Sequence, residues 1–545
     1  MNFTETPAYA LLKKHEIFLS DATISSLFSE NPDRFREFSC SVGDIIFDYS
    51  KNLIDRKVRS YLIKMAEQIG LKSKIFDMFD GVKINFTESR AVLHTALRDS
   101  EAQSIKENGR NIIPVVRDTF DDLFRFAESV RSGTYLGMSK RRILDVVNIG
   151  IGGSHLGPMM VVEALRPYKT PLINFHFVSN VDGTDIKDTL KKLEPETTLF
   201  IVASKTFTTG ETMTNAATAR TWIVSKLGEG AVERHFAAVT SDVKLAAGFG
   251  IAKERIFSFG DYIGGRFSMW GPVGLPAMIA VGERHFKSFL GGAYLADEHF
   301  KKTDFKDNIP VLMALVSVYN CNFLGIESEA VLPYDHYLRL FPAYLQQLAM
   351  ESNGKSVDSD GRRVGYRTSP VVFGGEGTDV QHSFCQLIHQ GSHKILCDFI
   401  VPVFSHNETG DHHIKLLANA IAQSEALMCG KSEEAVLAEL KSIKTPADKI
   451  MKQLPFKTFD GNRPSNTFLI KKITPETLGT LAALYEHKTF VQGVLWDINS
   501  FDQMGVELGK QLAGKILGDF KGTKKGEYDS STAGLMDIVK ELRKI

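Results

Sequence analysis

Between residues 116 and 283, short runs of β-branched and other apolar residues alternate regularly with longer amphipathic stretches. The apolar runs lie near residues 143–149, 173–178, 198–203, 235–239 and 255–258. This alternation predicts parallel strands joined by helices, so that helices cover both faces of one sheet. In sheets of this kind, ligands bind beyond the carboxyl ends of the strands.

A second, larger series of the same kind follows. Its helices are expected near 283–300, 309–324, 337–350, 411–429 and 475–492, and its strands near 330–333, 371–373, 395–403 and 467–470. The first 115 residues show a pattern typical of helices, with a short apolar and polar alternation at 82–86. The tail after residue 505 contains one helix, a break rich in Gly, Lys and Ser at 522–531, and a short last helix.

We therefore predict an α/β protein with two doubly wound βα domains, mostly parallel sheets, a helical N-terminal segment and a C-terminal helical arm. The smaller domain spans 116–283, and the larger one combines 1–115 with 284–505. Residues 506–545 form the arm, and an extended tail of this type often wraps a neighbouring domain or subunit.

Composition excludes several classes of function. Among 545 residues, 43% are hydrophobic and 24% charged, as in a soluble globular enzyme. The 65 basic and 65 acidic residues cancel, so no overall charge attracts nucleic acid or a membrane surface. The five cysteines are scattered without CxxC pairs, which favours reduced thiols in a cytoplasmic protein. We find no leader pattern and no apolar run of membrane-spanning length.

Two strand-to-helix turns are rich in groups that bind phosphate. Residues 204–212 follow a buried strand and read Ser-Lys-Thr-Phe-Thr-Thr-Gly-Glu-Thr, which offers hydroxyls, one ammonium and the N–H groups of a helix start. Residues 150–158, Gly-Ile-Gly-Gly-Ser-His-Leu-Gly-Pro, follow another strand, and their glycines allow close backbone approach. Together they indicate a phosphorylated small molecule.

Each turn alone is equally compatible with a tight chain reversal. Lys205 is not preceded by the spaced glycines of a P-loop, so neither turn is a P-loop for a nucleoside triphosphate. A dinucleotide fold is the stronger competitor, but His155 stands where its third glycine belongs. The strand at 173–178 also ends in Ser179-Asn180 rather than in an acidic residue.

Three further segments carry candidate catalytic groups. Glu351 ends an apolar helix before Ser-Asn-Gly, a position where partial burial can raise the pKa of a general base. Arg266 follows Gly264-Gly265 and can stabilise an oxyanion. Gln503 and Lys510 lie two helical turns apart if one helix covers both. A solvated glutamate, a structural ion pair for Arg266 and a surface lysine remain the alternatives.

Several histidines allow a metal site to be imagined. His389 and His393 are four residues apart, and His412-His413 follow Asp411. Neither an HExxH pattern nor a cysteine partner accompanies them, so we expect no metal.

The chain resembles the glucose-6-phosphate isomerase family in these same segments. Residues 261–271 and 501–510 are similar to the two signature patterns of that family. Further resemblance lies in residues 150–158, 203–212, 332–355 and 377–390, so it covers most of the chain between about 140 and 515. It implies sugar-isomerase-type, flavodoxin-like βα domains. His155 and Met504 depart from the residues common in the family, which affects loop packing or affinity rather than proton transfer.

The resemblance also implies a role for each matching residue. The phosphate and substrate contacts would come from Gly153, Ser154, Ser204, Lys205, Thr206, Thr209, Gln347 and Gln503. Glu351 would be the base, Arg266 the cation beside the enediolate and Lys510 the lysine near the ring oxygen. His382 would open the ring and, as in family dimers, reach the site from the partner subunit.

The expected activity is the reversible conversion of glucose 6-phosphate into fructose 6-phosphate, a step of glycolysis and gluconeogenesis. Ring opening and one proton transfer between adjacent carbons need acid, base and a fixed cation, but no redox cofactor and no metal. The expected partners are a sugar phosphate and a second copy of the chain, without nucleic acid or membrane. The rival hypotheses are a non-catalytic phosphosugar-binding regulatory protein and a nicotinamide-dependent oxidoreductase.

Overall fold

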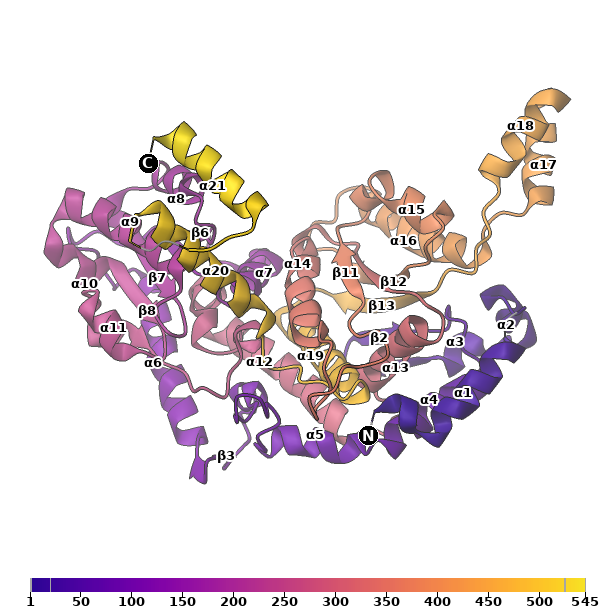
Figure 1. Cartoon of the computed structure of the whole chain (residues 1–545), viewed down its shortest axis with the longest axis horizontal. Coiled ribbons are helices and arrows are strands. Elements are labelled where there is room, and N and C mark those ends of the chain that lie inside the picture. The colour runs from indigo at the N-terminus through magenta and orange to yellow at the C-terminus, as the bar shows by residue number, and fades with distance from the viewer. Residues whose placement is uncertain (1, 20, 524–525, 545) are drawn as a thin grey trace. The chain divides into compact units, whose positions relative to one another are not determined.

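The computed structural model describes residues 2–19, 21–523 and 526–544 (Figure 1). The chain forms two compact units, Met1–Ser500 and Phe501–Ile545. The first unit contains a five-stranded sheet, a six-stranded sheet and a two-stranded ribbon of β3 (Lys106–Glu107) and β4 (Arg110–Asn111). The second unit is helical.

The five-stranded sheet is entirely parallel. Its strands are β5 (Asp145–Ile149), β6 (Asn174–Val178), β7 (Thr198–Ala203), β8 (Phe236–Val239) and β9 (Ile256–Phe257). They lie in the order β6-β5-β7-β8-β9, which confirms the five strands predicted from the apolar runs. The order reverses direction between β5 and β7, and in an open α/β sheet that switch point is where ligands bind.

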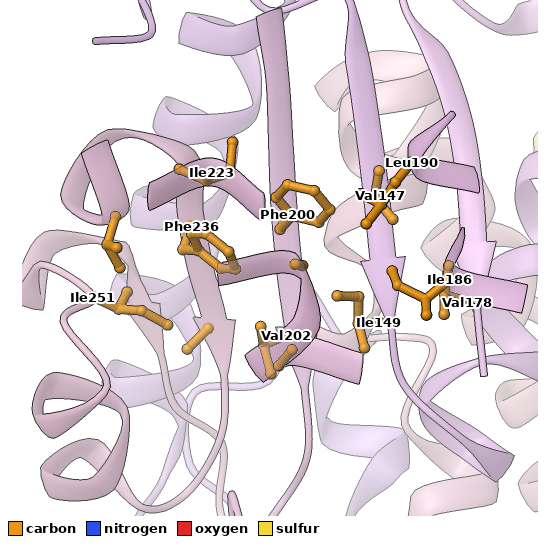
Figure 2. Close-up of a cluster of buried hydrophobic side chains, with 14 of the residues drawn as sticks. Val147, Ile149, Val178, Ile186, Leu190, Phe200, Val202, Ile223, Phe236 and Ile251 are labelled. Atoms are coloured by element: carbon orange, nitrogen blue, oxygen red, sulfur yellow. The ribbon is translucent and has the colours of Figure 1, made fainter. Parts of the chain in front are cut away.

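Burial on both faces explains why these strands read as continuous apolar runs. Every residue of β7 is buried, and the Phe200 ring stacks on Phe236 with centroids 5.0 Å apart. Figure 2 shows these side chains packed with Ile149 from β5, Val202 from β7 and Ile223 from a covering helix. The covering helices are α6 (Ile113–Ser132), α7 (Leu156–Ala164), α8 (Gly183–Leu190), α9 (Gly210–Leu227), α10 (Val232–His235) and α11 (Val243–Gly248).

The six-stranded sheet is mixed but mostly parallel, which confirms the predicted fold class. Its order is β1-β2-β13-β12-β10-β11, and the last four strands in that order run parallel. The predicted strands appear as β10 (Ser328–Pro333), β11 (Val371–Gly374), β12 (Leu396–Phe404) and β13 (Ser465–Lys472).

The N-terminal segment contains strands that the sequence did not reveal. The expected helices are present as α1 (Pro7–Phe18), α2 (Ile24–Glu30), α3 (Arg34–Glu37), α4 (Arg56–Gln68) and α5 (Leu71–Phe79). Between them, β1 (Ser39–Val42) and β2 (Ile45–Asp48) form a hairpin that pairs antiparallel with β13. The alternation at 82–86 gives only an isolated bridge between Asn85 and Arg90.

The helices of the larger series lie close to their predicted positions. They are α12 (Leu275–Lys302), α13 (Ile309–Asn322), α14 (Phe341–Gln346), α16 (His412–Cys429) and α19 (Pro475–Leu495). Three more, α15 (Cys385–Gln390), α17 (Glu433–Ser442) and α18 (Ala447–Lys457), were not predicted. The helices α17 and α18 pack on each other through Val436, Leu440 and Ile450 and project from the sheet in Figure 1.

The long helices α12 and α19 pack with their backbones almost touching. A Cβ added at Gly292 would lie 1.8 Å from the carbonyl oxygen of Glu476, and one added at Gly479 would lie 2.0 Å from that of Phe289. Only glycine fits at such contacts, and backbone atoms have little freedom to move away. This packing fixes α19 across the centre of the first unit.

The second unit contains α20 (Gly505–Phe520) and α21 (Ser530–Arg543), as predicted for the tail. Lys540 of α21 donates to the Asp519 carboxylate at 2.6 Å, which joins the two helices. None of the helices in the described part of the chain is long and apolar enough to cross a membrane. The division into domains at 116–283, at 1–115 with 284–505, and at 506–545 stays a prediction.

The contact at Gly292 can be tested by adding one methyl group. We expect Gly292→Ala to lower the free energy of unfolding by about 1–3 kcal/mol or more, because the helices must separate. Urea unfolding followed by circular dichroism measures the change. Gly291→Ala is the matched control: its methyl group meets nothing within 4 Å, so it should be neutral or stabilise by up to ~1 kcal/mol. Equal stability of the two variants would contradict the close helix packing.

Candidate active site

The two predicted phosphate loops lie side by side at the switch point of the five-stranded sheet. Their strands β5 and β7 are paired neighbours, with Ile149 opposite Val202. A Cβ at Gly150 would lie 2.6 Å from the carbonyl oxygen of Ser154 and 3.2 Å from that of Ala203. The loop that holds Gly153 and Ser154 therefore contacts the start of the loop that begins at Ser204.

The hydroxyl loop, residues 204–209, has its own internal hydrogen bonds. The hydroxyls of Ser204 and Thr209 are 3.0 Å apart, and those of Thr206 and Thr208 are 2.7 Å apart. Phe207 takes a left-handed φ of 53° and buries its ring, which turns the loop sharply. The first turn of α9 follows at once, so hydroxyls and helix N–H groups lie together as donors for an anion.

Lys205 joins this loop to the arginine segment, residues 261–268. Its ammonium donates to the carbonyl oxygens of Asp261 and Ile263 at 3.2 and 3.3 Å and lies 3.4 Å from the Asp261 carboxylate. Burial lowers the pKa of Lys205, opposed by the charge of Asp261. The ammonium therefore stands at the rim of the hydroxyl loop, between the two segments.

The arginine segment also contacts the glycine loop, residues 150–158, directly. A Cβ at Gly153 would lie 2.1 Å from the carbonyl oxygen of Gly265, so only hydrogen fits between the two backbones. Gly265 begins the short helix η8 (Gly265–Phe267), which contains Arg266. Glycine at 153 thus lets Arg266 approach the phosphate loops.

Arg266 is 3% exposed and held by hydrogen bonds from two directions. Its Nε donates to the Ser352 hydroxyl and its Nη2 to the carbonyl oxygen of Ser500, both at 2.6 Å. Its Nη1 lies 3.6 Å from Glu351 Oε2, which is an ion pair but longer than a hydrogen bond. The guanidinium is thus fixed beside the carboxylate.

Glu351 ends a π-helical turn, η11 (Gln347–Glu351), that continues α14. Such turns are rare and occur frequently at functional sites. The Gln347 amide donates to Glu351 Oε2 at 2.8 Å, and the glutamate side chain is 21% exposed. A Cβ at Gly152 would lie 3.1 Å from the Gln347 amide nitrogen, so the glycine loop contacts this helix too.

The contacts join most of the predicted site residues into one cluster. Its predicted members are Gly153, Ser154, Ser204, Lys205, Thr206, Thr209, Arg266, Gln347 and Glu351. A hydroxyl-rich anion loop at one end and a carboxylate beside a guanidinium at the other suit a small molecule with a phosphate and an acidic C–H bond.

The contacts described above do not include three of the predicted residues. His382 ends the short helix η12 (Asp379–His382), where its side chain is exposed and its ring makes no hydrogen bond to another described residue. Gln503 and Lys510 belong to the second unit. The helix α20 begins at Gly505 and covers only Lys510, so the two residues do not share a helical face, and Lys510 pairs with Glu507 at 3.0 Å.

Two serines that anchor Arg266 were missed from the sequence. Ser352 directly follows Glu351, and Ser500 precedes the segment that was singled out for Gln503. The Ser500 hydroxyl also donates to the side chain of Asn353 at 2.6 Å. Their adjacency to Glu351 and to the Gln503 segment was the available signal, although a serine in a loop carries no pattern of its own.

Two of the four histidines considered for a metal have other contacts. His389 Nε2 lies 2.7 Å from the Gln423 side-chain oxygen, and His413 Nε2 lies 2.9 Å from the carbonyl oxygen of Val403. Within the described residues, no group of three His, Cys, Asp or Glu side chains is placed to hold a metal ion.

A doubly wound α/β fold with an anion loop beside a paired glutamate and arginine defines the class of sugar-phosphate isomerases. The profile of one family in that class, phosphoglucose isomerase, matches residues 48–536. The chain is also 49% identical over 542 residues to a glucose-6-phosphate isomerase of Methylococcus capsulatus, across 99% of both chains. The chain belongs to the phosphoglucose isomerase family.

Solved structures agree with this assignment. The crystal structure of a glucose-6-phosphate isomerase from Chlamydia trachomatis superposes with a TM-score of 0.86 at 32% identity, over 99% of this chain and 100% of the other. A hypothetical protein from Thermus thermophilus shares the fold, with a TM-score of 0.62 at 23% identity over 84% of this chain and 96% of the other.

The contact between Gly153 and Gly265 predicts the effect of one substitution. We expect Gly153→Ala to weaken the binding of a hexose phosphate at least tenfold, or about 1.4 kcal/mol, because the phosphate loop and the arginine segment must move apart. Isothermal titration calorimetry measures the affinity. Gly183→Ala, whose methyl group meets nothing within 4 Å, should bind as the wild type does. Wild-type affinity in Gly153→Ala would refute the contact.

Proposed function

We propose that this cluster is the active site in which glucose 6-phosphate and fructose 6-phosphate are interconverted. The chain is an aldose–ketose isomerase by its membership of the family. The observation that carries the assignment of the site is the convergence of three segments. The hydroxyl loop, Arg266 and Glu351 are far apart in sequence and are joined by the contacts of Gly153, Lys205 and Gln347.

The phosphate of the sugar occupies the hydroxyl loop in this proposal. Ser204, Thr206 and Thr209 donate hydroxyl hydrogen bonds, and the N–H groups at the start of α9 add the positive end of an 18-residue helix. Ser154 and the backbone of Gly153 complete the donors from the neighbouring loop. Binding energy from the phosphate then orients the reacting carbons without acting on them chemically.

The ring must open before a proton can move between carbons. In our proposal His382 donates a proton to the ring oxygen while the hydroxyl at the first carbon of the aldose loses its proton to solvent water, which gives the open-chain aldehyde. Solvent then returns a proton to His382. Lys510 stabilises charge near the ring oxygen, and Gln503 contacts the substrate. Closing the ring of the ketose reverses the same proton movements, so the step needs no other reactant.

Glu351 then moves the proton. Its carboxylate removes the proton from the second carbon of the open-chain aldose, and the electrons form the carbon–carbon double bond of a cis-enediolate. Arg266, 3.6 Å from Glu351, stabilises the negative oxygen. A proton then passes from the oxygen at the second carbon to the oxygen at the first carbon, and the protonated Glu351 returns its proton to the first carbon, which gives the open-chain ketose. The Gln347 amide keeps the carboxylate oriented. Protons and electrons balance, so the step uses neither a redox cofactor nor a metal.

We further propose that the active form is a homodimer in the cytoplasm. His382 is exposed on η12, where it is available to a second subunit. A histidine delivered across a dimer interface would complete the site of the partner. The five cysteines are unpaired, as expected in a reducing compartment.

Removing the base tests the proposed chemistry directly. We expect Glu351→Gln to lower turnover by at least ~10²-fold, because the amide cannot accept the proton. Exchange of the hydrogen at the second carbon with deuterated water, followed by NMR, should fall in parallel, whereas affinity for fructose 6-phosphate should change little. Glu327→Gln removes a 57%-exposed carboxylate outside the cluster and serves as the control. Normal exchange in Glu351→Gln would rule out the assignment of the base.

Mixing two inactive variants tests the shared site. His382→Ala and Glu351→Gln should each be nearly inactive alone. After unfolding and refolding together, half of the dimers are hybrids, and one of the two sites in each hybrid contains both groups. We therefore expect about one quarter of wild-type turnover in an equal mixture. Each variant refolded alone is the control, and the absence of any recovery would show that His382 does not act across the interface.

A further inference from the structure

The fully buried carboxylate of Glu486 takes no part in the proposed chemistry, but it connects the segment of Arg266 with the helix that leads to Glu351. Glu486 lies on α19 and is 1% exposed, and its Oε2 accepts a hydrogen bond from Arg98 at 2.6 Å. Arg98 already donates to both carboxylate oxygens of Asp297, at 2.6 and 2.7 Å. Since Asp297 alone balances the charge of Arg98, the second buried carboxylate needs another explanation.

The other oxygen of Glu486 faces the active-site segments. Its Oε1 accepts a hydrogen bond from the indole N–H of Trp270 at 2.7 Å and one from the hydroxyl of Tyr344 at 3.4 Å. Trp270 is four residues after Arg266 in the chain. Tyr344 lies on α14, seven residues before Glu351, and the π-helical turn that ends at Glu351 continues this helix.

Two ring contacts extend the link to Arg266. The His94 ring stacks on Phe267, the neighbour of Arg266, with centroids 4.8 Å apart, and its Nε2 lies 3.7 Å from Glu486 Oε2. The guanidinium of Arg98 lies over the Trp270 ring at 4.8 Å. Short turns make the segment from Arg266 to Trp270 stiff, since the Ser268 hydroxyl donates to the carbonyl oxygen of Gly265 and the Gly271 N–H to that of Ser268.

We propose that Glu486 is a positioning residue for the isomerisation. Its carboxylate holds the arginine segment through Trp270, and it holds α14, the helix that leads to Glu351, through Tyr344. In this way it sets the distance between Arg266 and Glu351. This inference rests on the active site proposed above. Displacing a catalytic group by about 1 Å can reduce the rate 10²-fold, so one shared anchor for both segments has a direct effect on turnover.

The chemistry of the anchor requires an acceptor on both sides. Trp270 and Arg98 present N–H donors to the two oxygens of Glu486, and each of them needs a lone pair. A glutamine keeps the shape but offers an oxygen on one side and an NH₂ group on the other. One donor of the pair therefore faces another donor and moves away. Burial raises the pKa of Glu486, and the charge of Arg98 opposes this shift.

The experiment compares kcat and KM of Glu486→Gln with those of the wild type, well below the unfolding temperature. We expect kcat to fall about tenfold or more and KM for fructose 6-phosphate to stay within about threefold, because the phosphate loops do not contact Glu486. The double variant Glu486→Gln/Trp270→Phe should lose no more in kcat than the worse single variant, as expected for residues that act through one contact.

A second buried carboxylate provides the control for a general loss of stability. Asp398 on β12 accepts hydrogen bonds from Tyr485 at 2.8 Å and from Asn466 at 2.7 Å, so its partners lie on α19 and β13. Tyr485 is the chain neighbour of Glu486. We expect Asp398→Asn to lower the unfolding temperature as Glu486→Gln does, while its kcat stays within about twofold of wild type.

An unchanged kcat in folded Glu486→Gln, or an equal loss of kcat in Asp398→Asn, would overturn the proposal. If Glu486→Gln does not fold, Tyr344→Phe removes only one hydroxyl from the same contact. Tyr344→Phe should lower kcat about threefold or more at constant KM. If both Tyr344→Phe and Trp270→Phe had a normal kcat, the proposal would also be overturned. A wild-type protein without isomerase turnover would instead refute the proposed function itself.

Discussion

The contact between the backbones of Gly153 and Gly265 is the constraint on which the site depends. It leaves no room for a side chain, because an added Cβ would lie 2.1 Å from a carbonyl oxygen. Through this contact, a phosphate loop at the switch point of the parallel sheet meets the segment that holds Arg266. The rest of the site follows from it: Arg266 lies beside Glu351, and Gln347 connects the glutamate back to the glycine loop.

Two of the buried arginines of the first unit, Arg98 and Arg266, illustrate different uses of the same side chain. Arg98 is enclosed by the carboxylates of Asp297 and Glu486 at hydrogen-bonding distance, which is an arrangement for stability and position. Arg266 donates to a serine hydroxyl and to a backbone carbonyl, while the carboxylate of Glu351 stays 3.6 Å away. A guanidinium held in this way is oriented before the negative charge of an enediolate develops, which is the basis of electrostatic preorganisation.

Much of this architecture was predictable because its signals are local. Parallel strands buried on both faces read as apolar runs, and the loops that follow them contain the hydroxyls and glycines of a phosphate site. The hairpin β1–β2 and the serines that hold Arg266 were missed. The two strands are short and lie within a segment whose pattern is otherwise helical, and a single loop serine carries no pattern. The role of Glu486 was invisible for another reason. Its contacts come from Arg98 and Trp270, which are more than 200 residues away in the chain and reach Glu486 only in the folded protein.

The most direct test is a crystal structure of the protein with a five-carbon sugar-acid phosphate, whose carboxylate imitates the enediolate. We predict that the phosphate lies within hydrogen-bonding distance of the hydroxyls of Ser204, Thr206 and Thr209, and that the carboxylate end lies between Glu351 and Arg266. A phosphate bound elsewhere, or a ligand that reaches the hydroxyl loop but leaves its acid end far from Glu351, would contradict the central claim that these segments form one isomerase site.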